Sequence, residues 1–194
     1  MLPLTRWRIA LLWRLAGKPV PPPHIVKQHI VLGYQRRHRL RTFVETGTYT
    51  GEMVAAVRGE FDRVISIELD HALYEAARRR FADDSGVQLL RGDSGELLST
   101  VLRDLREPAM FWLDGHYMGV GTGRGAVDSP LVLEFRALLA HPVRGHVVLI
   151  DDARLCTGTD GYPTIEELQR MAQERPGTIV EVDGDIIRCT FDAN

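Results

Sequence analysis

The chain has 194 residues, of which 44% are hydrophobic and 26% charged, an ordinary composition for a globular protein with one sizeable core. The formal net charge of −2 gives no sign of a nucleic-acid partner. Two cysteines, Cys156 and Cys189, are too few for a disulfide framework, so we expect a reducing, cytoplasmic location.

Residues 1–24 are expected to form a helical appendage followed by the proline-rich connector Val20–Pro23. The uncharged apolar run Ile9–Trp13 is shorter than the roughly 7–15 residues that a signal peptide needs. No stretch approaches the roughly 20 apolar residues of a membrane span. We therefore expect this helix to pack on the main domain, residues 25–194, or on a partner in a homodimer. Membrane contact through its tryptophans and arginines is the less favoured alternative.

A strand, a tight glycine turn and the start of a helix are predicted from Thr42 to Arg58, after a helix over Ile25–Arg37. The centre of this stretch reads TFVETGTYTG, residues Thr42–Gly51. Such a turn brings backbone N–H groups and a helix N-terminus close to a bound ligand, and a side chain in place of the glycine would block that approach. A turn required only for packing is the alternative.

The next strand is predicted over Val64–Leu69, reading VISIEL. It places Glu68 about twenty residues after the first glycine, the spacing at which an acid meets the hydroxyls of a ribose. The glycines are not spaced G-x-G-x-x-G, so the fingerprint of nicotinamide and flavin proteins fits poorly.

The pattern E-x-G-x-x-x-G followed by I-E-L resembles the class I S-adenosylmethionine-dependent methyltransferases. This resemblance implies that Glu68 binds the ribose hydroxyls. It also implies a set of residues around the methionine and ribose of the cofactor: Glu45, Thr46, Gly47, Thr48, Thr50 and Gly51.

Strands and helices then alternate. Asp70 can cap a helix to Phe81, and a strand over Val87–Leu90 leads into the turn Gly92-Asp93-Ser94. In the family this turn touches the adenine ring, so Asp93 and Ser94 are candidate base contacts. The alternative is that both residues only cap the helix Gly95–Leu105.

The remaining elements complete an α/β chain that closes on a hairpin. They are a strand over Ala109–Leu113, a glycine-rich lid over Met118–Asp128, a helix with Pro130 at its first position, a strand over Val147–Ile150, a helix opened by the capping box Thr164–Glu167, and strands over Thr178–Val182 and Ile186–Phe191 that flank Asp183-Gly184. The resemblance implies a Rossmann-like, seven-stranded, mostly parallel sheet with helices on both faces and a C-terminal antiparallel hairpin.

Three aspartates follow two of the predicted strands: Asp114 after the first, Asp151 and Asp152 after the second. Carboxylates from neighbouring strand ends make an all-oxygen cage of the kind that Mg²⁺ favours. The alternative is that Asp151 and Asp152 cap the following loop. The motifs LDGHY and LIDDA are similar to those of metal-dependent O-methyltransferases, both catechol-type and the macrocin-type enzymes that methylate sugars. The resemblance implies Asp114, Asp151 and Asp152 as ligands of Mg²⁺, with Asp114 also beside the cofactor.

The expected catalytic base differs between these two types. Catechol-type enzymes place a lysine three positions after the first metal aspartate, where this chain has Tyr117; sugar-modifying enzymes use the residue two positions after it, here His116. We expect His116 to be the base, with a metal ligand or a lid anchor as alternatives and Tyr117 as a reserve base. Catechol-type enzymes also have a lysine-bearing helix beside the cofactor. That makes Lys27 and Gln28 weak candidates for the pocket, and a solvated helix face is favoured.

Together these features predict a magnesium-dependent O-methyltransferase that uses S-adenosylmethionine and methylates a hydroxyl of a sugar or oligosaccharide, for example a mannoside. A catechol or another phenolic small molecule is the alternative acceptor. Two other classes remain open: a non-catalytic module that binds S-adenosylmethionine, and a nicotinamide oxidoreductase.

Overall fold

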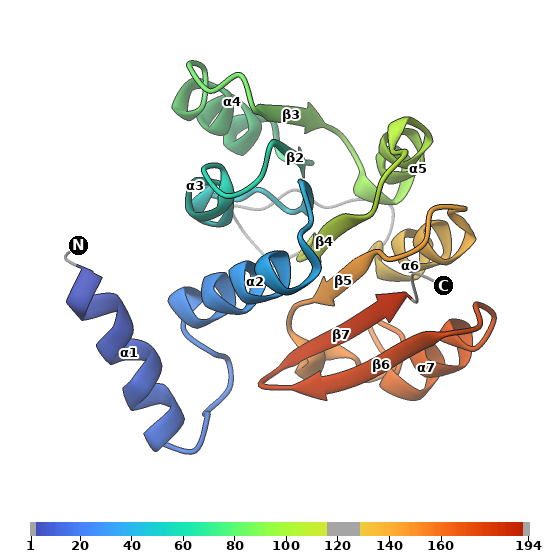
Figure 1. The fold of residues 1–194 in the computed structure, drawn as a ribbon. Coiled ribbons are helices and arrows are strands. Elements are labelled where there is room, and N and C mark those ends of the chain that lie inside the picture. The colour runs from blue at the N-terminus through green and yellow to red at the C-terminus, as the bar shows by residue number, and fades with distance from the viewer. Residues whose placement is uncertain (1–2, 116–128, 192–194) are drawn as a thin grey trace.

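The computed structural model describes residues 3–115 and 129–191 and shows a seven-stranded sheet flanked by helices (Figure 1). The strand order is β3-β2-β1-β4-β5-β7-β6, and all pairings are parallel except the two that β7 makes. The strands are β1 (Thr42–Thr46), β2 (Arg63–Glu68), β3 (Val87–Arg91), β4 (Ala109–Leu113), β5 (Val147–Ile150), β6 (Thr178–Asp183) and β7 (Ile186–Phe191). The predicted Rossmann-like α/β fold with its closing antiparallel hairpin is confirmed.

Helices cover both faces of this sheet (Figure 1). They are α2 (His24–His38), α3 (Glu52–Val57), α4 (His71–Arg80), α5 (Ser94–Asp104), α6 (Leu131–Ala140) and α7 (Ile165–Ala172), with a short 3-10 turn η1 (Ala153–Leu155) after β5. The first helix, α1 (Pro3–Leu15), lies to the side of the sheet and packs against α2 (Figure 1). Side chains alternate along each strand, so Phe43 and Met110 pack in one core with α2, α3 and α4. Val44 and Phe111, one residue further along, pack in the other core with α5, α6 and α7.

Most of the predicted helix starts are observed. The Asp70 side chain accepts hydrogen bonds from the backbone N–H groups of Ala72 and Leu73, and Thr164 forms the complete capping box with Glu167. The prediction for α6 is wrong by one residue. Pro130 is the cap of that helix rather than its first residue, and its carbonyl accepts the first helical hydrogen bond, from the N–H of Glu134 at 3.1 Å.

The turn of the β6–β7 hairpin also lies one residue later than predicted. Asp183 pairs with Ile186, so the two residues of the turn are Gly184 and Asp185, with φ angles of 62° and 67°. A two-residue turn that matches the twist of its strands needs positive φ at both positions. Aspartate tolerates that conformation, so the register is set by the pair Gly184-Asp185 rather than Asp183-Gly184.

The N-terminal segment packs against the tip of this hairpin. The Trp13 side chain is buried, its indole N–H donates to the carbonyl of Pro19 at 2.8 Å, and a Cβ placed on Gly184 would lie 3.3 Å from its ring. Lys18 forms an exposed ion pair with Asp183 at 3.0 Å. The expectation that this segment packs on the main domain is met. Within the described ranges, the helices lack the combination of length and apolar character that crossing a membrane requires.

Candidate active site

The order of the sheet reverses between β1 and β4, and the carboxyl ends of the strands on either side of this point form one edge. In open α/β sheets ligands bind at such a point. The ladder of hydrogen bonds continues just past the strands here: Gly47 donates to Ile67, Asp114 to Thr46, and Asp151 to Leu113. The predicted polar groups that follow these strands within the described residues are therefore brought to the same edge.

The two glycines after β1 are explained by packing within the chain. Gly47 has φ of 83°, and a Cβ there would lie 2.5 Å from the carbonyl oxygen of Asp114. Gly51 has φ of 75° at the start of α3, and a Cβ there would lie 2.8 Å from the Phe81 ring. Both positions require glycine on these grounds alone. The approach of a ligand is not needed to explain them.

A buried hydrogen-bonded chain runs beneath this turn. The Ser66 hydroxyl donates to Glu45 at 2.5 Å and lies 2.6 Å from the Thr48 hydroxyl. Burial raises the pKa of Glu45 to about 8; the Ser66 hydrogen bond opposes this rise and the charge of Glu68 adds to it. Glu45 is therefore held as a neutral acid at neutral pH in the protein without ligands. Thr48 directs its hydroxyl into this chain, whereas Thr50 is exposed.

Glu68 is fixed by two backbone groups. One carboxylate oxygen accepts from the N–H of Tyr49 and the other from the N–H of Asp70, both at 2.8 Å. The side chain is only 5% exposed. It thus joins the glycine turn to the start of α4, and its predicted contact with a ribose would use the remaining acceptor capacity of the carboxylate.

The turn after β3 shows the capping geometry that was one of its two interpretations. Asp93 accepts from the backbone N–H of Gly95 at 2.8 Å and so caps α5. Ser94 is buried, and a Cβ placed on Gly115 would lie 3.2 Å from both the Ser94 and the Thr46 hydroxyl oxygens. The strand ends after β1, β3 and β4 therefore meet here, and adenine contact by Asp93 and Ser94 stays a prediction.

Glu134, on α6, is the buried acid next to this junction. It is 1% exposed, and burial raises its pKa to about 7, with the Ser94 and Thr46 hydroxyls opposing the rise and the charge of Asp93 adding to it. This residue was not anticipated. The available signal was a single acid on the apolar helix LVLEFRALLA.

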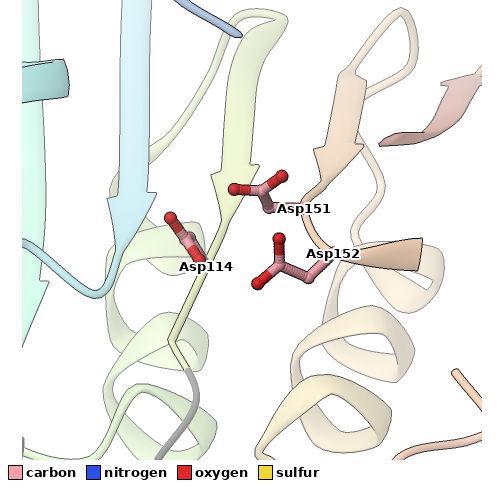
Figure 2. A group of neighbouring side chains, drawn as sticks. All are labelled: Asp114, Asp151 and Asp152. Atoms are coloured by element: carbon pink, nitrogen blue, oxygen red, sulfur yellow. The ribbon is translucent and has the colours of Figure 1, made fainter. Parts of the chain in front are cut away.

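The three predicted metal ligands lie together at the ends of β4 and β5 (Figure 2). Leu113 pairs with Ile150, so Asp114 and Asp151 follow in register on neighbouring strands. Asp152 has φ of 56°, which turns the chain so that its carboxylate faces the same space. One oxygen from each carboxylate lies within 4.8 Å of the others.

The three clustered carboxylates repel one another in a buried setting. Burial and the charges of Asp151, Asp152 and Glu45 raise the pKa of Asp114 well above its ordinary value, with Lys27 opposing the rise. The Oδ1 atom of Asp151 is buried without a hydrogen-bond partner in the described part of the chain. A hard divalent cation accepts all-oxygen ligands and would satisfy this atom. The residues present fit such an ion, which is not part of the structure.

Lys27 contradicts the expectation of a solvated helix face. Its ammonium group donates to Asp151 Oδ2 and lies 3.5 Å from Asp152 Oδ1, with the Lys27 side chain only 15% exposed. Burial lowers the pKa of Lys27, but the hydrogen bond and charge of Asp151, together with the other carboxylates, outweigh this and raise it. Gln28 is buried too and donates to the carbonyl of Glu52 at 3.2 Å. The reason is tertiary: α2 crosses the sheet beside the ends of β4 and β5 (Figure 1).

Two further side chains border the cluster. Arg154 donates to Asp152 at 2.8 Å and also to Asp185 in the hairpin turn. Tyr162 is half-buried, and its pKa is raised by burial and by the charges of Asp152, Cys156 and Asp114.

Sequence reasoning missed Ser66 and Arg154 as well as Glu134. Ser66 had a readable signal, since it is the one hydroxyl in the buried run VISIE of β2. Arg154 has a local partner in Asp152, two residues earlier, but its second partner, Asp185, lies 31 residues away in the sequence. The predicted base His116, the reserve base Tyr117 and the lid Met118–Asp128 lie outside the described residues.

Comparisons with known proteins identify the fold. No family model matches the chain, and no curated protein matches it. Similar solved structures include the O-methyltransferase of Bacillus cereus in complex with S-adenosylhomocysteine, at 14% identity and a TM-score of 0.65 over 99% of this chain and 92% of that one. The O-methyltransferase TomG of Streptomyces achromogenes, involved in tomaymycin synthesis and solved with S-adenosylmethionine, has 17% identity and a TM-score of 0.63 over 97% and 89%. A putative caffeoyl-CoA O-methyltransferase of Staphylococcus aureus has 12% identity and a TM-score of 0.61 over 96% and 92%.

Proposed function

We propose that this protein is a divalent-cation-dependent O-methyltransferase that uses S-adenosylmethionine. The observation that carries the proposal is the cage of Asp114, Asp151 and Asp152 beside the glycine turn of β1. The solved O-methyltransferases with the same fold, two of them in complex with S-adenosylmethionine or S-adenosylhomocysteine, support the choice of cofactor.

The cofactor would lie along the carboxyl ends of β1, β2 and β3. Glu68 would accept hydrogen bonds from the ribose hydroxyls, and Asp93 and Ser94 would contact the adenine. The turn from Thr46 to Gly51 would surround the methionine part, with Glu45 beneath it. Because Glu68 and Asp93 are already held by hydrogen bonds from backbone N–H groups, these side chains would lose little conformational entropy when the cofactor binds.

The acceptor would lie next to the acidic cluster. Asp114, Asp151 and Asp152 would hold Mg²⁺, which when bound supplies Lewis-acid polarisation of a hydroxyl. His116 would take the proton of that hydroxyl, a role typically worth ~10²–10⁴-fold in rate. Fixing the hydroxyl in line with the methyl group could contribute up to about 7–11 kcal/mol to lowering the barrier.

A sugar or oligosaccharide hydroxyl, such as that of a mannoside, is the proposed acceptor. The support is His116 at the position that sugar-modifying enzymes use, together with the polar surroundings that Arg154 and the half-buried Tyr162 give the cluster. A vicinal diol would present two neighbouring oxygens to one cation.

A catechol or related phenol is the second candidate acceptor. The observation that favours it is Lys27 at the acidic cluster, since catechol-type enzymes have a lysine near their metal. In the arrangement observed, however, the Lys27 ammonium is held in its charged form by Asp151, which does not suit a base.

Two experiments test the proposal. Calorimetry should show binding of S-adenosylhomocysteine but not of nicotinamide dinucleotides; the reverse result would refute the cofactor assignment. A panel of mannosides and catechols, with S-adenosylmethionine and Mg²⁺, should then show methyl transfer that excess chelator abolishes. Binding of the cofactor with no transfer to any acceptor would identify a non-catalytic module instead.

Variants separate the roles within the site. Asp151→Ala should abolish turnover and leave cofactor affinity within a few-fold of wild type, because Asp151 lies outside the glycine turn. Activity that persists in chelator would contradict the metal assignment. His116→Ala should lose most turnover with unchanged affinity for Mg²⁺, and a loss of Mg²⁺ binding would reassign His116 as a ligand.

A further inference from the structure

The ammonium group of Lys27 occupies the acidic cluster. It contacts Asp151 Oδ2 and Asp152 Oδ1, and the charge of Asp114 acts on it as well. These are the same three residues whose oxygens lie within 4.8 Å of one another. We propose that Lys27 is a built-in counter-cation of this cluster, and that a divalent cation binds only when the Lys27 ammonium leaves. The inference rests on the metal site of the proposed function, and it adds that Lys27 regulates how readily a divalent cation binds there.

The first reason is that both cations would be held by the same three carboxylates, with Lys27 on one oxygen of Asp151 and the divalent ion on the other. Mg²⁺ requires its ligands at about 2.0–2.1 Å in near-octahedral geometry. The oxygen Asp151 Oδ2 is taken by a hydrogen bond from Lys27. An ammonium and a divalent ion on neighbouring oxygens would also repel each other strongly in a buried site.

The second reason is that the ammonium can move while its helix stays in place. Lys27 lies in the first turn of α2, between Val26 and Gln28, which are both buried, and Gln28 is anchored to Glu52. The backbone is therefore fixed, but the charge lies at the end of a flexible four-carbon stem. The Lys27 side chain is 15% exposed against 1% for Asp151, so it has a route to water that the carboxylate lacks.

Arg154 does not have this role. It pairs with Asp152, but it is also bound to Asp185 through its guanidinium and through its backbone N–H at 2.8 Å. Arg154 thus belongs to the junction between η1 and the hairpin turn and keeps partners when a metal arrives. Within residues 3–115 and 129–191, the Lys27 side chain pairs with the cluster carboxylates Asp151 and Asp152.

The consequence is an exchange of cations, in which either the Lys27 ammonium or a divalent ion always neutralises the carboxylates of the cluster. Without metal, Lys27 lowers the repulsion among the three carboxylates. With metal, it is displaced. Because the two occupancies exclude each other, each must weaken the other by the same factor.

The sequence offers an unusually direct test, since Lys18 and Lys27 are its only lysines. Lysine labelled with ¹³C at Cε should give two NMR signals in the wild-type protein, and Lys18→Met assigns them. Adding Mg²⁺ should shift the Lys27 signal, whereas Lys18, at the hairpin, should not respond. An unchanged Lys27 signal at Mg²⁺ concentrations that saturate the protein would overturn the inference.

Affinity for the metal alone provides the second measurement. Mn²⁺ binding, followed by electron paramagnetic resonance without cofactor or acceptor, should tighten by roughly tenfold or more in Lys27→Met and stay at the wild-type value in Lys18→Met. If Lys27→Met binds Mn²⁺ no more tightly than wild type does, while Asp151→Asn no longer binds it, the exchange is overturned but the metal site is supported. If neither wild type nor Lys27→Met binds Mn²⁺, the metal part of the proposed function fails, and the inference fails with it.

Discussion

Replacing Glu45 by glutamine should remove a large pH dependence of stability. Glu45 is 2% exposed, and its pKa is raised from 4.5 to about 8. In the unfolded chain the same carboxyl ionises near its ordinary value. Because the folded pKa is the higher one, the stability that Glu45 contributes is fully present below about pH 4.5 and is lost as the pH rises through about 8. Each pH unit in this window lowers the free energy of unfolding by about 1.4 kcal/mol, to a limit of about 5 kcal/mol.

Glu45→Gln keeps the shape of the side chain and an oxygen that can accept from Ser66, but it cannot ionise. Relative to wild type, the variant should gain about 2–3 kcal/mol in the free energy of unfolding between about pH 5.5 and about pH 7.5. Urea unfolding followed by tryptophan fluorescence at several pH values measures this difference. Glu96→Gln is the matched control, since Glu96 is exposed on α5. Parallel pH profiles for wild type and Glu45→Gln would refute the reasoning.

Three further predictions concern the frame around the site. His146 accepts from the N–H of Ala109 at 3.0 Å and shares a 2.8 Å hydrogen bond with His141, and burial lowers its pKa to about 4, with nearby His141 and Arg175 adding to this. The contribution of His146 to the free energy of unfolding should therefore fall by up to about 3 kcal/mol as the pH drops from about 6.5 to about 4. In urea titrations the difference in stability between His146→Gln and wild type should change by about this amount over that range, and a difference that does not change with pH would contradict the prediction. Gly47→Ala should lower the free energy of unfolding by about 2–4 kcal/mol and weaken Mn²⁺ binding, because the added Cβ would clash with the Asp114 carbonyl. If the variant kept the thermal stability and the Mn²⁺ affinity of the wild type, this clash would be excluded. Arg175 donates to carbonyls in the last turn of α6 and just after it, those of Leu138, Leu139, His141 and Val143. Arg175→Met should therefore lose about 2–3 kcal/mol in the free energy of unfolding, measured by chemical unfolding with the exposed Arg103→Met as control, and a loss no larger than that of the control would refute the capping role.

Much of the site could be predicted because the relevant signals are local. Asp114 and Asp151 directly follow apolar strands, and parallel strands end at one edge, so their proximity follows once the strands are recognised. Asp70 and Thr164 precede helices at cap positions, and their hydrogen bonds are observed. These predictions depend on residues only a few positions apart.

The errors arise where partners are distant in the chain. Lys27 looks like a solvated helical residue, but it lies 124 residues from Asp151, whose carboxylate it contacts. The packing reason for the glycine turn is also distant, since a Cβ on Gly47 would meet the backbone of Asp114, and the approach of a ligand to this turn stays a prediction. The hairpin register was misplaced by one residue because both Asp183-Gly184 and Gly184-Asp185 are good turn pairs, and only strand pairing decides between them.

The amino-acid sequence by itself determined the α/β class, the ends of the strands and the acidic character of the cluster. It could do so because the spacing of hydrophobic residues, helix capping and the conformations open to glycine all depend on residues that are close together in the chain. The tertiary structure decided which charges meet. A helix placed near the N-terminus delivers the ammonium of Lys27 to carboxylates that end strands β4 and β5. Coulomb energy depends on distance in space and on burial, and neither quantity can be read from separation along the sequence.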